Sequence, residues 1–83
     1  MINLNKNELQ ALKFIDKHSN SITDYQMNRF LITKMDPDDL QTTRTRIRQL
    51  NLAELFEFEG HYYWRITTEG IDEMDRQGIK RQE

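Results

Sequence analysis

The sequence predicts a small α+β fold that is mainly helical, with three helices, then a β-hairpin, then a short fourth helix. Two observations carry this prediction. Three helix starts repeat one capping pattern in the first half of the chain. The second half changes to a run rich in aromatic residues that alternates around Gly60, which is typical of a hairpin. With 83 residues in total, we expect one domain over 1–79 and a frayed tail over 80–83.

Each of the three helices is predicted to begin where a capping residue is followed by a polar residue three positions later. In a capping box, each of these side chains accepts a hydrogen bond from the other residue's backbone N–H. The capping pairs are Asn5 with Glu8, Thr23 with Gln26, and Asp36 with Asp39. Pro37 adds to the third start because proline is favoured at the first helical position. Asn51 tolerates the left-handed backbone that often ends a helix. We therefore expect helices at about 6–18, 24–33 and 37–50.

The hairpin at 52–66 can close in two ways, and these place different side chains in the core. A two-residue loop would put the phenylalanines of the first strand and the apolar residues of the second on opposite faces. The three-residue loop Glu59-Gly60-His61 puts them on one face. Because burial of one apolar face is favourable, we expect the three-residue loop. The side chains then expected in the core are Phe56, Phe58, Tyr62, Trp64 and Ile66, with Glu57, Tyr63 and Arg65 in solvent.

A short fourth helix is expected after the hairpin, capped by Thr67 or Thr68 and ended near Gly78. Apolar residues on this helix and on the first helix have two interpretations. They could form the seam of a homodimer, or they could pack in the core of one molecule. The residues concerned are Phe14, His18, Ile71 and Met74.

The third helix carries an unusual polar face. At about 100° per residue, Leu40, Thr43, Ile47 and Leu50 fall on one stripe, which we expect to be buried. The opposite side holds glutamine, threonine and arginine without a carboxylate, and such side chains can donate hydrogen bonds to base edges and phosphates. A solvated helix face is the alternative. The residues expected to bind DNA are Gln41, Thr42, Arg44, Thr45, Arg46, Arg48 and Gln49.

The order of elements, together with the run LNLAELFEFEGHYYWRITTEGIDEM, resembles the winged helix-turn-helix domain of small bacterial and phage regulators. In that family a recognition helix is followed by a wing and a hydrophobic-Thr-x-x-Gly element, here Ile66 to Gly70. The resemblance implies a supporting helix at 23–33, a recognition helix at 36–50 and a wing at 52–66. It also implies sequence-specific binding of double-stranded DNA and regulation of transcription.

The expected wing is short and acidic, which departs from the family pattern. It carries three glutamates against His61 and Arg65. Tyr63, which could stack on bases, and Arg65 are its candidates for DNA contact. Because the acidic character leaves wing-to-phosphate contact open, the alternative function is a protein-binding adaptor or inhibitor that uses this wing. The glutamates are Glu54, Glu57 and Glu59.

Charge and composition restrict the functional classes and the cell compartment that remain possible. The net charge is −2, but residues 41–50 contain three arginines and no acid, and local charge governs DNA binding. The absence of cysteine excludes a disulfide framework and favours a reducing compartment. No apolar run is long enough to span a bilayer, so we expect a soluble, cytoplasmic protein without a membrane partner.

Catalysis, a cofactor and a metal are not expected. His18 and His61 lie on separate elements, and no nucleophile–base spacing or glycine-rich phosphate loop is present. Glu59 and His61 could in principle hold a metal ion, but a solvated turn explains them better.

Overall fold

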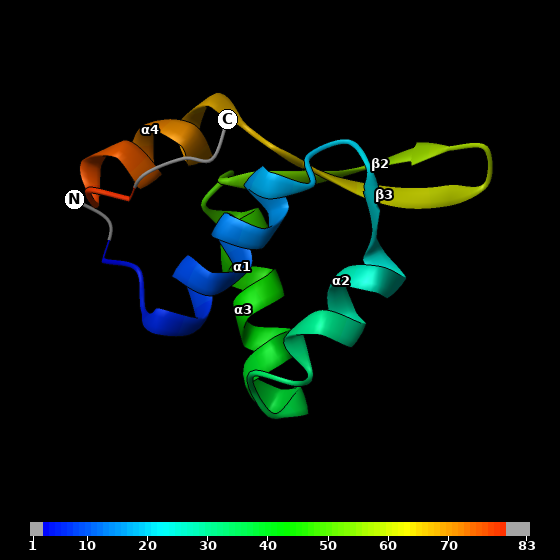
Figure 1. The fold of residues 1–83 in the computed structure, drawn as a ribbon, viewed down its shortest axis with the longest axis horizontal. Coiled ribbons are helices and arrows are strands. Elements are labelled where there is room, and N and C mark those ends of the chain that lie inside the picture. Colours follow the sequence, from blue (N-terminus) through cyan, green and yellow to red (C-terminus); the bar gives the residue numbers. More distant parts are fainter. Residues whose placement is uncertain (1–2, 80–83) are drawn as a thin grey trace.

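The structure, a computed structural model, describes residues 3–79. These residues form four helices and a three-stranded antiparallel sheet (Figure 1). The prediction of an α+β fold is therefore confirmed, and each helix lies within two residues of its expected bounds. The tail predicted at 80–83 lies outside the described residues. The elements are α1 (Lys6–Lys17), β1 (Ile22–Thr23), α2 (Asp24–Leu31), α3 (Pro37–Gln49), β2 (Ala53–Phe58), β3 (His61–Ile66) and α4 (Thr68–Arg76).

The helices begin at the predicted caps. For α1, Asn5 Oδ1 accepts the Glu8 backbone N–H and Glu8 Oε1 accepts the Asn5 backbone N–H, both at 2.8 Å. Thr23 and Gln26 form the same reciprocal pair before α2, at 3.1 and 3.0 Å. Asp36 caps α3 through its Oδ1, which accepts the Asp39 N–H at 2.8 Å. These bonds satisfy backbone donors that a helix leaves unpaired at its N-terminus.

Helix α3 ends at a left-handed residue that turns the chain directly into β2. Asn51 has φ 58°, its N–H donates to Arg48 O at 3.0 Å, and the Leu52 N–H donates to Ile47 O at 3.0 Å. This is the hydrogen-bond pattern of a Schellman motif, and asparagine is among the residues that adopt it at lowest cost. The prediction that Asn51 ends the third helix is confirmed.

The third strand, β1, was not predicted. It pairs antiparallel with β3, so the strand order is β1-β3-β2, with Ile22 opposite Trp64 and Thr23 opposite Tyr63. The connection from α1 is held to the same strand, since the Asn20 N–H donates to Trp64 O at 3.0 Å. A strand of two residues is too short to show an alternating pattern, so its sequence carries no recognisable signal.

The predicted hairpin register is wrong. Phe58 pairs with His61, so the loop is the two-residue Glu59-Gly60, and both loop residues have positive φ (51° and 81°). Positive φ at both positions is the signature of a type I′ turn, whose twist matches that of the flanking strands. Leu55, not Phe56, therefore lies opposite Trp64 on the core face.

The register changes where the aromatic side chains lie. Trp64 is fully buried and Ile66 packs against the core, as predicted. Phe56 instead shares the outer face with Tyr63, and the two rings stack with centroids 5.7 Å apart. Phe58 and Tyr62 were expected in the core but are 57% and 56% exposed.

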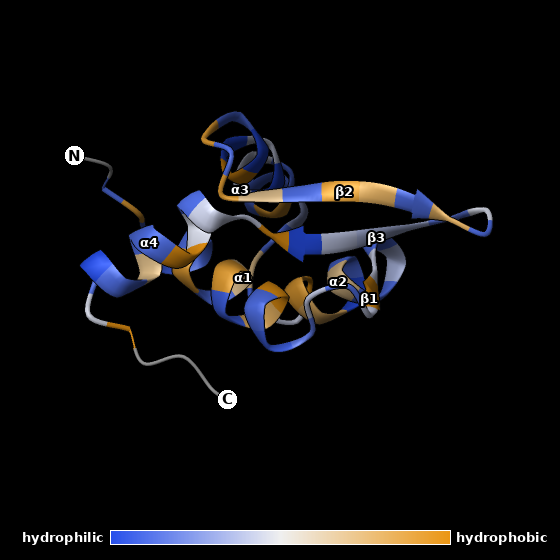
Figure 2. Cartoon of the chain, turned by 90° about the horizontal axis from the view of Figure 1, so that it is seen from above, coloured by the Kyte–Doolittle hydropathy of each residue, from blue (hydrophilic) through white to orange (hydrophobic). Residues whose placement is uncertain are grey.

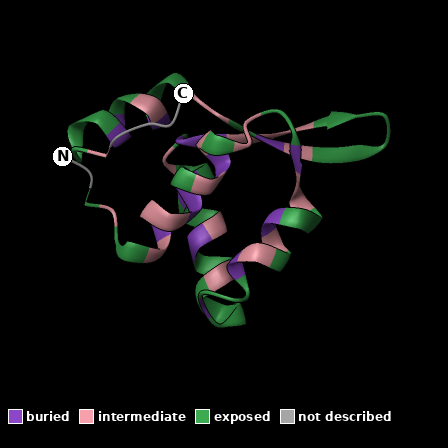
Figure 3. Ribbon diagram, viewed as in Figure 1, coloured by how far each residue is buried: buried purple, intermediate pink, exposed green. Residues whose placement is uncertain are grey.

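The reason for this error is that the hairpin extends beyond the helices. Its outer half is exposed on both faces (Figure 1, Figure 3), so no apolar burial acts there to select a register. The turn geometry and the inner half decide instead. There, Ala53 and Leu55 of β2 lie on the same face as Trp64 and Ile66 of β3.

Helix α1 is central to the core and contacts α3, β3, α2 and α4. The helices are amphipathic, with apolar positions interspersed among polar ones (Figure 2). Trp64 is the largest fully buried side chain, and its Nε1–H donates to Asp24 Oδ1 at 2.9 Å. The buried apolar residues are Ala11, Leu12, Ile15, Ile22, Met27, Leu31, Met35, Ile47, Leu52, Ala53, Trp64 and Met74.

The Thr-x-x-Gly element joins α4 to the end of α3. Thr67 Oγ1 accepts the Gly70 N–H at 3.0 Å and donates to Asn51 O at 2.6 Å. The backbone of α4 lies so close to this turn that a Cβ placed on Gly70 would come within 2.0 Å of Leu52 O. Thr67, one of the two expected caps, and Gly70 are therefore needed for packing.

Candidate nucleic-acid interface

The exposed side of α3 forms a continuous polar surface, which we call the outer face of α3. Burial of Thr43 and Ile47 against the core turns this side of the helix to solvent. Its residues are Gln41, Thr42, Thr45, Arg48 and Gln49, all of them exposed. The predicted division of α3 into a buried stripe and a polar face is therefore confirmed.

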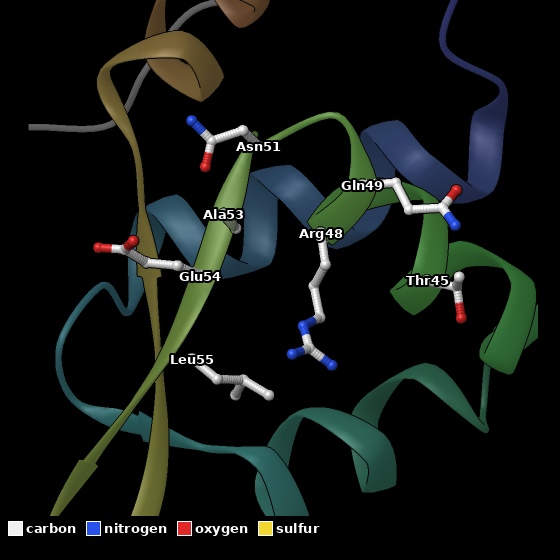
Figure 4. Close-up of a pocket in the computed structure, with 7 residues that line it drawn as sticks. All are labelled: Thr45, Arg48, Gln49, Asn51, Ala53, Glu54 and Leu55. Atoms are coloured by element: carbon white, nitrogen blue, oxygen red, sulfur yellow. The ribbon is translucent and has the colours of Figure 1, made fainter.

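Two shallow hollows follow this face. One, of about 350 Å³, is lined by Gln41, Thr42, Thr45, Arg46 and Gln49. The other, of about 440 Å³, lies between α3 and β2, and the guanidinium of Arg48 extends into it toward Leu55 (Figure 4). Its remaining lining residues are Thr45, Gln49, Asn51, Ala53 and Glu54. The outer face thus continues onto the first strand of the hairpin.

Arg44 is engaged within the fold. Its Nη2 donates to Asp24 Oδ1 at 2.8 Å, and its side chain is only 19% exposed. The same carboxylate oxygen accepts the Trp64 indole, and the Arg44 guanidinium lies 6.0 Å from the Trp64 ring. Arg44 therefore connects α3 to α2 and β3, and its charge is already neutralised.

Arg46 also has an internal partner. Its Nε lies 2.6 Å from Glu8 Oε2, and its Nη2 donates to the backbone oxygen of Asn3 at 3.2 Å. The Glu8 side chain is only 1% exposed, and a carboxylate at that depth requires a counter-charge. Arg46 is 45% exposed but provides that counter-charge, so it holds α3 against the start of α1.

Arg48 differs from both. Within residues 3–79 it makes no ion pair, and it is exposed on the outer face. The three arginines of 41–50 thus leave one unpaired positive charge at the surface, because Asp24 and Glu8 neutralise the other two. The sequence argument that this segment presents three positive charges needs this correction.

The structure does not bring Tyr63 and Arg65 together with Arg48. Both lie on the hairpin face opposite Leu55, whereas Leu55 lines the hollow that contains Arg48. Arg65 pairs with Glu54 at 2.7 Å, and its guanidinium lies 4.7 Å from the Phe56 ring. Glu54 itself points away from Arg48 (Figure 4). Strand alternation could have separated these residues had the register been known.

The four residues considered for a dimer seam have different environments. Met74 is 1% exposed and belongs to the core, which favours the core-packing interpretation of this residue. Ile71 is half-buried. Phe14 stacks on Phe30 with centroids 3.9 Å apart, and His18 meets Phe14 edge-on at 4.8 Å. The sequence analysis did not identify Phe30.

His18 lies at the end of α1, and His61 lies beside the hairpin turn. In residues 3–79 no three potential metal ligands gather at one place. None of the helices in this range has the length and apolar character needed to cross a bilayer.

Comparisons with protein-family models, with curated proteins and with solved structures gave no significant match to this chain.

Proposed function

We propose that this protein binds double-stranded DNA sequence-specifically as a winged helix-turn-helix regulator of transcription, with α3 as its recognition helix. The observation that carries the proposal is the outer face of α3, which presents glutamine, threonine and one unpaired arginine without a carboxylate. The order of three helices and a hairpin supports the same proposal. An α-helix with such a face fits the width of the major groove.

In this proposal Arg48 makes the central contact. Its guanidinium can donate two hydrogen bonds to one guanine or one to a phosphate. Thr45 and Gln49 lie beside it and supply further donors and acceptors for base edges. Arg44 and Arg46 act as positioning residues, since they hold α3 against α2 and α1 through Asp24 and Glu8.

The experiment is selection from a random duplex library at about 50 mM salt, followed by titration of the enriched duplex. We expect the wild-type protein to enrich one sequence, and Arg48→Ala to abolish the enrichment. Arg65→Ala is the matched control: this arginine is also exposed but pairs with Glu54 on the other hairpin face, so its loss should leave the selected sequence unchanged. A folded wild-type protein that binds no duplex under these conditions would refute the proposal.

A second function, binding of a protein partner through the hairpin, is favoured by one observation. Phe58 and Tyr62 are more than half exposed near the hairpin turn, next to Glu57 and Glu59. Carboxylates repel phosphate, whereas exposed aromatic side chains are common anchors of protein interfaces. Failure of the DNA experiment would leave this adaptor or inhibitor function as the better account.

A further inference from the structure

The hairpin tip, residues 57–62, exposes the ring of Phe58, which is followed by Glu59 in the turn and preceded by Glu57 on the opposite strand face. Phe58 is 57% exposed, and Glu57 and Glu59 on either side of it form no ion pair within residues 3–79. Phe58 also lies beyond the stacked pair of Phe56 and Tyr63 and is not part of that contact. An exposed ring with carboxylates near it, at the end of a projecting hairpin (Figure 1), is suited to insertion into a cavity.

A hollow with the opposite character lies between α1 and α2. Its volume is about 510 Å³, and its aromatic lining comes from Phe14, His18 and Phe30, with Met74 from α4. Of the described residues, three lysines also line it, but only one carboxylate does, that of Asp16. The lysines are Lys13, Lys17 and Lys34, and Lys34 Nζ lies 5.7 Å from the Phe30 ring centroid. We call this the lysine-rimmed hollow.

We propose that the hairpin tip of one molecule inserts Phe58 into the lysine-rimmed hollow of a second copy of this chain. The tip supplies what the hollow lacks, an apolar ring with adjacent carboxylates, and the hollow supplies aromatic walls with adjacent ammonium groups. Lysine–carboxylate pairs at the rim would orient the contact, while the buried ring would supply most of its affinity.

The hairpin tip of a molecule does not lie in that molecule's own hollow. The hairpin turn lies beside the first turn of α2, where Gly60, His61 and Tyr62 share a hollow with residues 23–26. The lysine-rimmed hollow lies beside Phe30 and Lys34 at the other end of that helix. Within residues 3–79, therefore, the tip and the hollow do not occupy one another.

Such a contact is heterologous, so it joins copies head to tail rather than as a closed two-fold dimer. A contact built on one inserted ring is small, and we expect weak, concentration-dependent association. The proposal does not depend on DNA binding, because both surfaces lie outside the outer face of α3.

The test is the weight-average mass of the wild-type protein from sedimentation, over roughly 10 µM to 1 mM. We expect the mass to rise beyond that of a dimer. Phe58→Ala should weaken the association at least about tenfold. Ile32→Ala is the control, since Ile32 is 54% exposed and belongs neither to the tip nor to the lining of the hollow. Circular dichroism should show each variant to be folded.

A mixing experiment separates this geometry from a symmetric dimer. The tip variant carries Phe58→Ala and Glu59→Gln, and the hollow variant carries Lys17→Glu and Lys34→Glu. We expect each variant alone to be monomeric and their mixture to form a 1:1 heterodimer that grows no further. A wild-type protein that stays monomeric throughout would overturn the proposal, as would a mixture without a heterodimer, or association that survives Phe58→Ala.

Discussion

Arg44, Arg46 and Arg48 stand at every second position of α3, so Arg46 points away from the other two, whereas Arg44 and Arg48 lie about 40° apart on one side, one turn from each other. Their environments nevertheless differ. Arg44 reaches Asp24, Arg46 reaches Glu8, and Arg48 reaches solvent. Their sequence spacing separates Arg46 from the other two, but it does not show which arginines meet an acid, because Asp24 and Glu8 lie far away in the chain.

At this scale we predict that Arg44→Ala lowers the free energy of unfolding by about 1–3 kcal/mol, because it leaves the Asp24 carboxylate without its cation beside Trp64. Arg48→Ala, the matched control in the same helix, should change it by less than about 0.5 kcal/mol. Urea denaturation monitored by Trp64 fluorescence measures both. Equal effects of the two substitutions would show that Arg44 has no special structural role.

Gly70 provides a second residue-scale prediction. Gly70→Ala should destabilise the protein by roughly 1–3 kcal/mol, because the new Cβ would approach Leu52 O to 2.0 Å and force α4 away from the α3–β2 turn. Glu69→Ala, at the exposed neighbouring position, is the control. Thermal unfolding followed by circular dichroism compares them. If Gly70→Ala were as stable as the wild type, this close approach would not constrain the fold.

At the scale of elements, the hairpin is governed by its turn. Glu59 adopts φ 51°, a left-handed conformation that glutamate tolerates less well than asparagine. We predict that Glu59→Asn, which creates the Asn-Gly pair favoured in type I′ turns, raises the free energy of unfolding by about 0.5–1 kcal/mol. Glu57→Asn is the control, since it lies within the strand. A loss of stability on Glu59→Asn would contradict the two-residue turn.

Helix starts and strand pairing differ in how far the sequence predicts them. Helix starts were predictable because Asn5 and Glu8, or Thr23 and Gln26, form their bonds within one turn of chain. The hairpin register depended on which parts of β2 and β3 are covered by helices, and strand β1 depended on pairing with residues about 40 positions away. Such non-local contacts leave no local pattern to detect.

At the scale of the whole molecule, ion pairs determine how much positive charge the outer face of α3 presents. Internal acids neutralise Arg44 and Arg46, and Glu54 neutralises Arg65, so the outer face of α3 depends on Arg48 and on uncharged donors. The position of this face was predictable from helical periodicity. Its reduced charge was not, because the partners come from α1, α2 and the hairpin. We therefore expect duplex binding with a weak salt dependence, close to that of one or two phosphate contacts.

The most direct measurement is the affinity of single arginine-to-glutamine variants for the selected duplex, by fluorescence anisotropy at fixed salt and at a temperature where all are folded. Arg48→Gln should lose about 1–3 kcal/mol of binding, roughly 5- to 150-fold. Arg44→Gln and Arg46→Gln should bind within about threefold of the wild type while unfolding more easily. An Arg46→Gln variant that loses as much affinity as Arg48→Gln, or an Arg48→Gln variant that binds normally, would contradict the account.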